Sequence, residues 1–406
     1  MNNNKKKRSR WVKWRHKPIR DLLNLVFTPY VRKKYGVTIE PFRGQPRRQY
    51  LILFNHQTAY DQFFVGAAFD CPVYYVASED LFSNGISSAL IKYLVAPIPI
   101  KKQATDPRAV INCIKVAKEG GTIALAPEGN RTFTGRSVHI NPAIASLARH
   151  LGLPIAFFRI EGGYGVHPRW SDAVRGGNMK AGVSRVMERE EYLSLTDEEL
   201  CETIRKELYT DESLPDREYP CERQAEYLER AIYLCPVCGL SKFESSGDLI
   251  SCKRCSLTVR HKPTKELCGV GTSFPYSSVA EWYDAQESYV NSLDPRALGN
   301  EPLECDNVRA FEVIPYKKKR IVYKNAELRL YKDRFTVSHE GDILELPFDS
   351  ISVVAVLGKN KLNVYSGKQV YQLKGGARLC ALKYVNLFYR YKNVTKGDLD
   401  AKFLGL

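Results

Sequence analysis

Short apolar runs alternate with amphipathic segments between residues 50 and 186, and this alternation restricts the fold more than any other feature of the chain. The predicted strands are 50–54, 73–77, 122–126 and 154–160, and the predicted helices are 109–117 and 142–150. Strands that alternate with helices form a largely buried sheet with helices packed on its faces. The sequence therefore predicts an α/β domain with a central mixed sheet flanked by helices.

The chain has 406 residues, which is enough for two or three domains. Its composition changes at several points. The predicted parts are a basic amphipathic segment (1–34), the α/β domain (35–232), a cysteine-rich module (233–262), a linker with a short helix (263–304) and a β-rich domain (305–406). Within the α/β domain, the segment 222–232 is predicted to be a helix.

The β-rich domain is predicted from short apolar runs separated by turn residues between positions 327 and 373. A helix follows, with Leu379, Leu382, Val385 and Phe388 on one face. This order of elements resembles a pleckstrin-homology-like or GRAM-like barrel, which implies recognition of a lipid headgroup. A generic β-rich dimerisation domain is the alternative.

The chain is strongly basic, with 61 Lys and Arg residues against 45 Asp and Glu residues and a formal net charge of +16. Nine basic residues and no acidic residue lie among the first 20, next to Trp11 and Trp14 and before an apolar stretch at 22–31. This composition favours an interfacial helix that lies among anionic lipid headgroups. The alternatives are a disordered basic tail before an ordinary core helix, and a nucleic-acid-binding arm.

Neither export nor a membrane-spanning helix is predicted. Residues 1–20 lack the apolar core of a signal peptide, and the longest apolar stretch, 89–100, contains Lys92 and two prolines where a span needs about 18 uncharged residues. Seven of the 11 cysteines are scattered without a framework spacing, which favours a reducing compartment. We therefore expect a cytoplasmic protein with peripheral or monotopic attachment to the cytoplasmic face of a membrane.

A histidine and an aspartate follow the first predicted strand. His56 and Asp61 are five residues apart, which would separate them by about 140° on a regular helix, so they meet only if the chain turns between them. An aspartate that accepts a hydrogen bond from one imidazole nitrogen leaves the other nitrogen free to take a proton. By itself, such a pair is weak evidence, because most pairs of a histidine and a nearby aspartate are structural or incidental.

A second polar string, 125–132, also follows a predicted strand. In it, Gly129 allows the backbone to approach a ligand closely, and Arg131 offers a bidentate fork for phosphate. Glu128 can orient a hydroxyl or Arg131 itself, and Lys101 with Lys102 adds two cations after another apolar run. For this string alone, a Pro-Gly turn with a surface salt bridge is the simpler interpretation.

In this order and spacing, the strings resemble the signature of the glycerolipid acyltransferases typified by 1-acylglycerol-3-phosphate acyltransferases. That signature is His-x4-Asp, a basic block, Pro-Glu-Gly-x-Arg and a Pro-containing apolar strand. The corresponding residues here are 56–61, 100–102, 127–131 and 153–156. The resemblance covers roughly residues 20–190. Ala126, Asn130 and Phe157 depart from the usual pattern, so the acceptor and the preferred acyl length do not follow from it.

The resemblance implies a definite chemistry. His56 would be the general base toward an acceptor hydroxyl, and Asp61 would support its imidazole. The phosphate of a lysophospholipid acceptor, 1-acylglycerol-3-phosphate, would be bound by Glu128, Gly129 and Arg131 together with Lys101 or Lys102. The acyl donor would be a thioester of coenzyme A or of acyl carrier protein, and the product would be phosphatidic acid.

Four cysteines form two C-x2-C pairs separated by 13 residues, namely Cys235, Cys238, Cys252 and Cys255. Four thiolates on two such knuckles are typical of a structural, tetrahedral Zn²⁺ site in a zinc ribbon, and they leave no open position for catalysis. The alternatives are a redox dithiol and chance clustering. Because so small a module buries little surface, zinc is expected to supply most of its folding free energy.

Two functions are consistent with the sequence. One is a membrane-associated acyltransferase whose partners are anionic membrane lipids, the lysophospholipid acceptor and the acyl donor. The other is a scaffold that binds nucleic acid or protein through the ribbon, with an inactive acyltransferase-like domain. The intact pair of His56 and Asp61 beside Glu128 and Arg131 favours the enzyme, and the ribbon shows no basic face between its knuckles that would favour nucleic acid.

Overall fold

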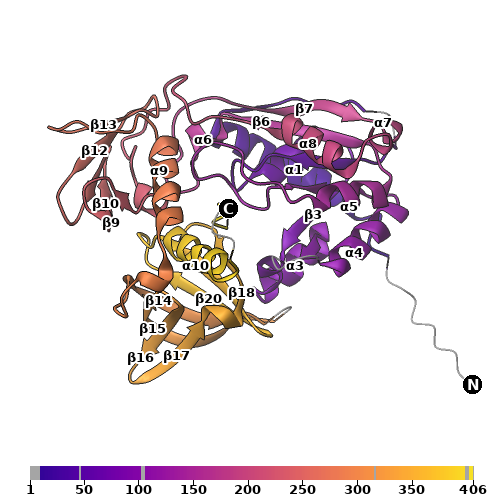
Figure 1. The fold of residues 1–406 in the computed structure, drawn as a ribbon. Coiled ribbons are helices and arrows are strands. Elements are labelled where there is room, and N and C mark those ends of the chain that lie inside the picture. Colours follow the sequence, from indigo (N-terminus) through magenta and orange to yellow (C-terminus); the bar gives the residue numbers. More distant parts are fainter. Residues whose placement is uncertain (1–9, 45–46, 102–105, 315–316, 398–401, 406) are drawn as a thin grey trace, which may run out of the picture.

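The computed structural model describes residues 10–44, 47–101, 106–314, 317–397 and 402–405. It contains an N-terminal α/β domain, a small cysteine-containing sheet and a C-terminal β domain (Figure 1). Lys102 and the first nine residues of the predicted basic segment lie outside the described residues. Across the described ranges, no helix has both the length and the apolar character needed to cross a bilayer.

The α/β domain is built on a seven-stranded sheet with the order β1-β7-β6-β2-β5-β3-β4. Neighbouring strands are parallel except for β6 and β7, so the sheet is mixed, as predicted. The strands are β1 (Val37–Ile39), β2 (Leu51–Phe54), β3 (Val73–Ser78), β4 (Ile98–Ile100), β5 (Thr122–Leu125), β6 (Ile155–Glu161) and β7 (Met179–Met187). The helices are α1 (His16–Tyr35), α2 (Asp61–Ala68), η1 (Glu79–Phe82), α3 (Ile86–Val95), α4 (Pro107–Lys118), α5 (Ala143–Leu151), α6 (Gly163–Val166), α7 (Arg189–Leu193) and α8 (Asp197–Leu208).

Helices cover both faces of this sheet, which explains why β2 is apolar at every position. Ile52 and Phe54 belong to the core formed with α1 and α2, whereas Leu51 and Leu53 belong to the core formed with α4, α5 and α8. Successive side chains of a strand point to opposite faces, so a strand covered on both sides has no polar position. Because β2, β5, β3 and β4 run parallel, their carboxyl ends lie at the same edge of the sheet, between the two layers of helices.

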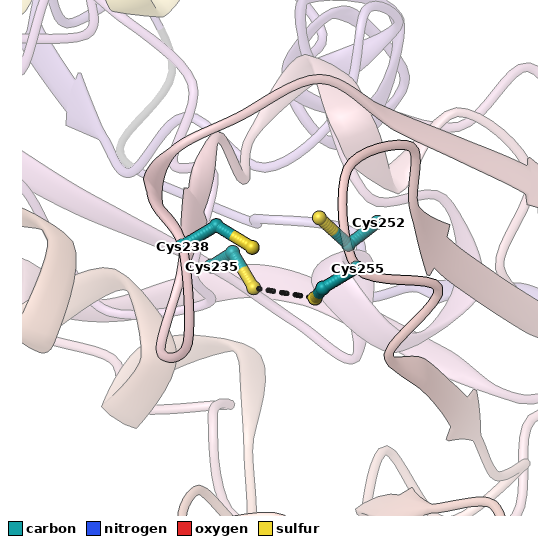
Figure 2. A group of neighbouring side chains, drawn as sticks. All are labelled: Cys235, Cys238, Cys252 and Cys255. Atoms are coloured by element: carbon teal, nitrogen blue, oxygen red, sulfur yellow. Dashed lines mark hydrogen bonds between the residues drawn. The ribbon is translucent and has the colours of Figure 1, made fainter.

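The cysteine-containing part follows α8. It comprises β8 (Leu234–Cys235), β9 (Gly239–Leu240), and a four-stranded antiparallel sheet of β10 (Phe243–Ser246), β11 (Leu249–Cys252), β12 (Thr258–His261) and β13 (Leu267–Gly269). The turn between β8 and β9 and the turn after β11 bring the four cysteines face to face (Figure 2). Helix α9 (Val279–Ser292) and the short η3 (Pro295–Ala297) then lead into the C-terminal domain.

The C-terminal β domain is an antiparallel half-barrel with the strand order β17-β16-β15-β14-β20-β19-β18, followed by one helix. Its elements are β14 (Glu304–Glu312), β15 (Arg320–Leu330), β16 (Arg334–His339), β17 (Asp342–Pro347), η4 (Phe348–Ser350), β18 (Ile351–Leu357), β19 (Lys361–Ser366), β20 (Gln369–Gly375) and α10 (Ala381–Thr395). The predicted succession of strands and a closing helix is confirmed. The likeness to pleckstrin-homology or GRAM domains stays a prediction.

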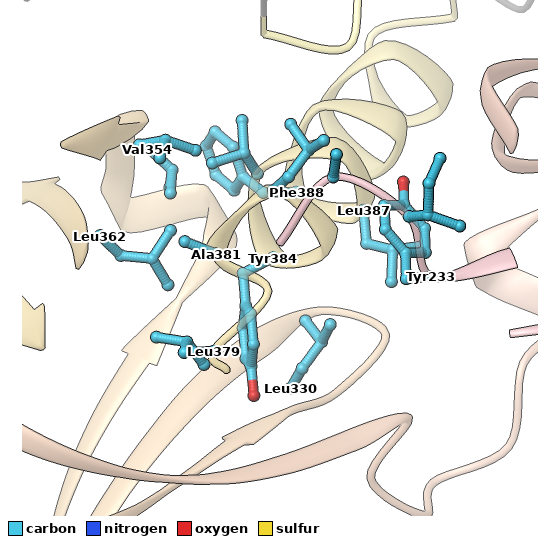
Figure 3. Packing of buried hydrophobic residues seen from close by; sticks show 14 of the residues in the cluster. Tyr233, Leu330, Val354, Leu362, Leu379, Ala381, Tyr384, Leu387 and Phe388 are labelled. Carbon is cyan, nitrogen blue, oxygen red and sulfur yellow. The ribbon is translucent and has the colours of Figure 1, made fainter. Parts of the chain in front are cut away.

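One hydrophobic core joins the cysteine-containing sheet, α9 and the C-terminal domain. Ile250 of β11, Trp282 of α9 and Leu373 of β20 belong to the same buried cluster, part of which is drawn in Figure 3. Within it, the Tyr233 hydroxyl donates to Asn386 Oδ1 of α10 at 2.7 Å. The two parts therefore support each other by packing, although they lie in separate sheets.

The helix predicted for 222–232 is wrong. The segment forms turns and the short 3-10 helix η2 (Leu228–Arg230), and Tyr227 has a left-handed backbone with φ of 62°. The apolar residues 228, 231 and 232 all enter the shared core, and Arg230 Nε donates to the carbonyl of Ala377. Tertiary contacts thus override the local helical pattern.

Candidate active site and cysteine cluster

The two polar strings of the α/β domain meet because β2 and β5 are adjacent parallel strands. His56 follows β2 and Glu128 follows β5, and Glu128 Oε2 accepts a hydrogen bond from the His56 backbone N–H at 2.8 Å. The residue before His56 is also fixed, since Asn55 Nδ2 donates to the Ile160 carbonyl and Asn55 Oδ1 accepts from the Ile160 N–H, both at 2.8 Å. The sequence reasoning missed Asn55.

His56 and Asp61 form the predicted pair. The chain turns after β2, α2 begins at Asp61, and His56 Nδ1 lies 2.7 Å from Asp61 Oδ2. The Asp61 carboxylate also accepts from the N–H groups of Gln57 and Thr58, each at 2.8 Å, and from the Thr58 hydroxyl at 2.7 Å. These donors fix the carboxylate, so Nδ1 of His56 carries its hydrogen toward Asp61.

The pair is asymmetric in its exposure. The Asp61 side chain is 0% exposed, whereas the His56 side chain is 28% exposed. With Nδ1 occupied by Asp61, Nε2 has no hydrogen-bond partner among the described residues. A neutral imidazole in this tautomer presents an unprotonated nitrogen to the sheet edge, which is what a general base requires.

Arg131 reaches under the His56 loop. Its Nε donates to the Gln57 carbonyl at 3.0 Å and its Nη2 donates to the His167 carbonyl at 2.9 Å. Burial lowers the pKa of Arg131, and the nearby Asp61 carboxylate opposes that shift. Nε thus holds the loop that carries His56, and Nη2 ties that loop's neighbourhood to the segment after α6; the predicted role of Arg131 in phosphate binding stays a prediction.

Gly129 is exposed and has φ of 66°, while a Cβ placed there would meet no atom within 4 Å. The position therefore requires glycine for its left-handed backbone rather than for clearance. Whether a ligand approaches it stays a prediction.

Lys101 lies on the same sheet edge but at a distance from the pair. It follows β4, which is separated from β2 by β5 and β3, or about 14 Å at the usual strand spacing. Its backbone N–H donates to Asp106 Oδ2 at 3.0 Å, and its side chain is exposed. The structure therefore brings His56, Asp61, Glu128 and Arg131 together. Lys101 lies apart from them, with the ends of β5 and β3 in between.

Residues 37–160 match the family model described as Acyltransferase. The α/β domain therefore contains an acyltransferase domain. Among solved structures, the crystal structure of the 1-acyl-sn-glycerophosphate (LPA) acyltransferase PlsC from Thermotoga maritima aligns with 47% of this chain and 79% of that chain, at 19% sequence identity and a TM-score of 0.37. No curated protein matches the chain.

The C-terminal domain contacts the acyltransferase domain at this same edge. Arg169, which is 3% exposed, donates from Nη1 to the Arg131 carbonyl at 2.7 Å. The same guanidinium donates from Nε to Gly358 and from Nη2 to Val356, at the end of β18. Arg169 therefore links the C-terminal domain through Arg131 to the loop that carries His56, a link that no sequence signal indicated.

Two further side chains, Lys359 and Asp80, make contacts across this boundary. Lys359 of the β18–β19 turn bonds the Ser171 carbonyl and Asp172 Oδ1. Asp80 of η1, after β3, bonds Lys319 and accepts from Gln372 Nε2 at 3.0 Å. The C-terminal domain thus packs beside the carboxyl ends of the strands of the acyltransferase domain.

Glu128 should make stability depend on pH. Burial raises its pKa to about 7, against the lowering effect of the hydrogen bond from His56. Between about pH 4.5 and 7 the folded protein keeps a proton that the unfolded chain has lost, so stability falls as pH rises through this interval. Glu128→Gln keeps an acceptor for the His56 N–H and removes the titration.

We expect Glu128→Gln to gain stability over the wild type as pH rises, by up to about 3 kcal/mol above pH 7. The measurement is urea unfolding at several pH values, with the exposed Glu340→Gln as the control. A difference that does not change with pH would contradict the assignment.

The four cysteines form a cluster whose sulfur atoms all lie within 4.8 Å of one another. Cys235 Sγ and Cys255 Sγ are 3.6 Å apart, and a dashed line joins them in Figure 2. Tetrahedral Zn²⁺ with bonds of about 2.3 Å places its sulfur ligands about 3.8 Å apart. The donor set and its spacing therefore fit a metal ion of this kind.

Proposed function

We propose that this protein is a membrane-associated acyltransferase that moves a fatty acyl group from a thioester to the free hydroxyl of 1-acylglycerol-3-phosphate, giving phosphatidic acid. The main support for this proposal is the His56–Asp61 pair. Its buried carboxylate binds Nδ1 of the imidazole, so Nε2 stays available at the edge of the sheet. The acyltransferase domain supports acyl transfer as the reaction class.

In the proposed reaction, His56 Nε2 takes the proton of the acceptor hydroxyl while its oxygen attacks the thioester carbonyl. The carbon–sulfur bond then breaks, and the proton on His56 passes to the leaving thiolate. The acyl donor is a thioester of coenzyme A or acyl carrier protein. Asp61 stabilises the imidazolium that forms between these two steps, because its carboxylate is 2.7 Å away.

The acceptor phosphate would lie along the edge between the catalytic loop and β4. Within the described residues, neither Arg131 Nη1 nor the ammonium of Lys101 at the other end makes a hydrogen bond. A phosphate that is reached by a guanidinium and a lysine forms charge-assisted hydrogen bonds with both. Glu128 and Gly129 contribute by shaping the loop.

The assay that tests this function supplies purified protein with vesicles that contain lysophosphatidic acid and with labelled acyl-CoA or acyl-acyl carrier protein in parallel. We expect labelled phosphatidic acid with one of the donors. Lysophosphatidylcholine and lysophosphatidylglycerol serve as competing acceptors. Absence of transfer from both donors to all three acceptors would refute the proposal.

For the cysteine cluster we infer Zn²⁺ as the bound metal, held by Cys235, Cys238, Cys252 and Cys255. Four thiolates saturate a tetrahedral ion, so the metal would be structural.

Membrane association is proposed to use α1 and the adjacent α3. Helix α1 exposes Leu22, Leu25, Val26 and Tyr30, and α3 exposes Ile86, Leu90 and Tyr93. The basic residues that precede α1 would meet anionic headgroups while these apolar side chains enter the interface. We propose an anionic bilayer as the partner of this surface, and its cytoplasmic face as the place of attachment.

We expect Leu22→Glu combined with Leu25→Glu to reduce co-flotation with anionic vesicles by about tenfold or more, because two exposed apolar side chains become charged. Ile343→Glu, which changes an equally exposed residue of the C-terminal domain, is the control. DNA and RNA retention measured across the same salt series tests the scaffold alternative. Retention of nucleic acid without flotation would favour the scaffold.

A further inference from the structure

Basic residues form a row across the outer face of the C-terminal sheet. Arg309 of β14 lies directly opposite Lys374 of β20, which lies directly opposite Lys361 of β19. Residues opposite each other in antiparallel strands project from the same face. The neighbouring residues Val308 and Leu373 are buried in the shared core, so the row occupies the face turned away from that core.

The row continues onto β15 at an irregularity. The pairing of β14 with β15 shifts between Val308 and Ala310, and Lys324 lies in the part of β15 that the shift leaves without a partner on β14. A β-bulge breaks the ladder locally and redirects side chains. Four cations on four consecutive strands are therefore gathered here.

None of these four cations has a hydrogen bond or an ion pair among the residues that the structure describes. Other cations of the same domain are paired, as Lys319 is with Asp80, Arg320 with Glu312 and Arg329 with Glu327. Like charges directly opposite each other in a sheet are destabilising. Lys361 is half-buried, and burial lowers its pKa because the charged ammonium loses solvation. Keeping Lys361 charged therefore adds to the unfavourable free energy of the row.

A cleft of about 640 Å³ lies over three of these cations, and Lys361 is not part of its lining. Its lining includes Arg309, Lys324 and Lys374, and also His339 of β16. The backbone of Gly376 borders it without a side chain, and a Cβ at that position would meet no atom within 4 Å. The cleft can therefore admit a ligand that reaches both side-chain and backbone donors.

Two carboxylates also line the cleft. Glu327 is already paired with Arg329, and Glu340 is 86% exposed on the turn after β16. Neither forms an ion pair with Arg309, Lys324 or Lys374, so the cationic groups stay available to an anion from solution.

We propose that this cleft binds a phosphate-bearing ligand through Arg309, Lys324 and Lys374. A guanidinium offers paired N–H groups to phosphate, and two ammonium groups add point charges, so a phosphate monoester or diphosphate relieves the repulsion within the row. The phosphate belongs either to a lipid headgroup or to a soluble molecule. This site is separate from the His56 centre and does not depend on the proposed reaction.

The test compares the full-length protein with Arg309→Gln/Lys374→Gln and with the charge-matched control Lys317→Gln/Lys368→Gln, whose exposed lysines lie outside the cleft. Inorganic pyrophosphate is titrated calorimetrically as the soluble probe. Phosphatidylcholine vesicles that carry phosphatidic acid, a phosphomonoester, are compared with vesicles that carry phosphatidylglycerol, a phosphodiester.

We expect pyrophosphate binding, or a preference for phosphatidic acid over phosphatidylglycerol, that the cleft variant weakens by about tenfold or more and the control leaves within about twofold. The cleft variant should melt no lower than the wild type, since like charges are removed. Binding of pyrophosphate alone indicates a soluble ligand, and the lipid preference alone indicates a headgroup. Equal losses in both variants, or no binding in either arm, would overturn the proposal.

Discussion

Replacement of His56 by alanine is expected to lower the rate of acyl transfer by about 10²–10⁴-fold, the usual contribution of a positioned general base. The side chain is 28% exposed, so its removal should leave the fold intact. His150→Ala, on the exposed end of α5, is the matched control. Initial rates and melting temperatures of both variants are the measurements.

The Asp61→Asn variant tests how far Asp61 positions and supports the imidazole of His56, which itself transfers the proton in the proposed reaction. The carboxylate accepts from two backbone N–H groups and from the Thr58 hydroxyl, and an amide would turn an NH₂ group toward some of these donors. We expect a comparable loss of rate together with a lower melting temperature, because a buried network is left unsatisfied.

For the His56→Ala variant, more than about a tenth of the wild-type activity would contradict the role of His56 as the general base.

Loss of the proposed Zn²⁺ is expected to have the largest effect on stability. Cys252→Ser removes one ligand, and structural zinc supplies much of the folding free energy of such modules. The consequence should extend beyond the ribbon, because Trp282 Nε1 donates to the Leu234 carbonyl at 2.7 Å and Tyr233 bonds Asn386 of α10. The ribbon and the C-terminal domain should therefore weaken together.

A loss of about 4 kcal/mol or more would lower the melting temperature of this unit by about 10 °C or more. Cys268→Ser, on β13 of the same sheet but outside the cluster, is the matched control. Metal analysis of the purified wild type should give about one equivalent of zinc. Wild-type protein that holds no zinc, or a Cys252→Ser variant that melts with the wild type, would refute the structural role.

The elements that carry the site could be predicted because each has a strong local signal. Strands β2 and β5 are apolar at successive positions, and each is followed by a polar string. Parallel strands open at one edge, so His56 and Glu128 could be expected near each other once the strands were adjacent. Spacing alone also indicated the four-cysteine cluster.

Other features had no such signal. Strand β14 (Glu304–Glu312) buries only positions 304, 308 and 310 completely and has polar residues at several others, so it has no clear apolar signal in the sequence. Helix α3 exposes Ile86 and Leu90, which in a sequence resemble core positions. The bond from Arg169 to the Val356 carbonyl joins residues 187 positions apart, and only the packing of two domains defines it.

That bond has a consequence for the order in which the protein becomes complete. Arg131 and the loop it supports are synthesised early, but Arg169 finds its acceptors Val356 and Gly358 only after most of the C-terminal sheet has been made. The nascent acyltransferase domain therefore emerges from the ribosome without part of the framework that holds its catalytic loop. The bonds from Arg169 to the C-terminal domain can form only after β18 has been synthesised.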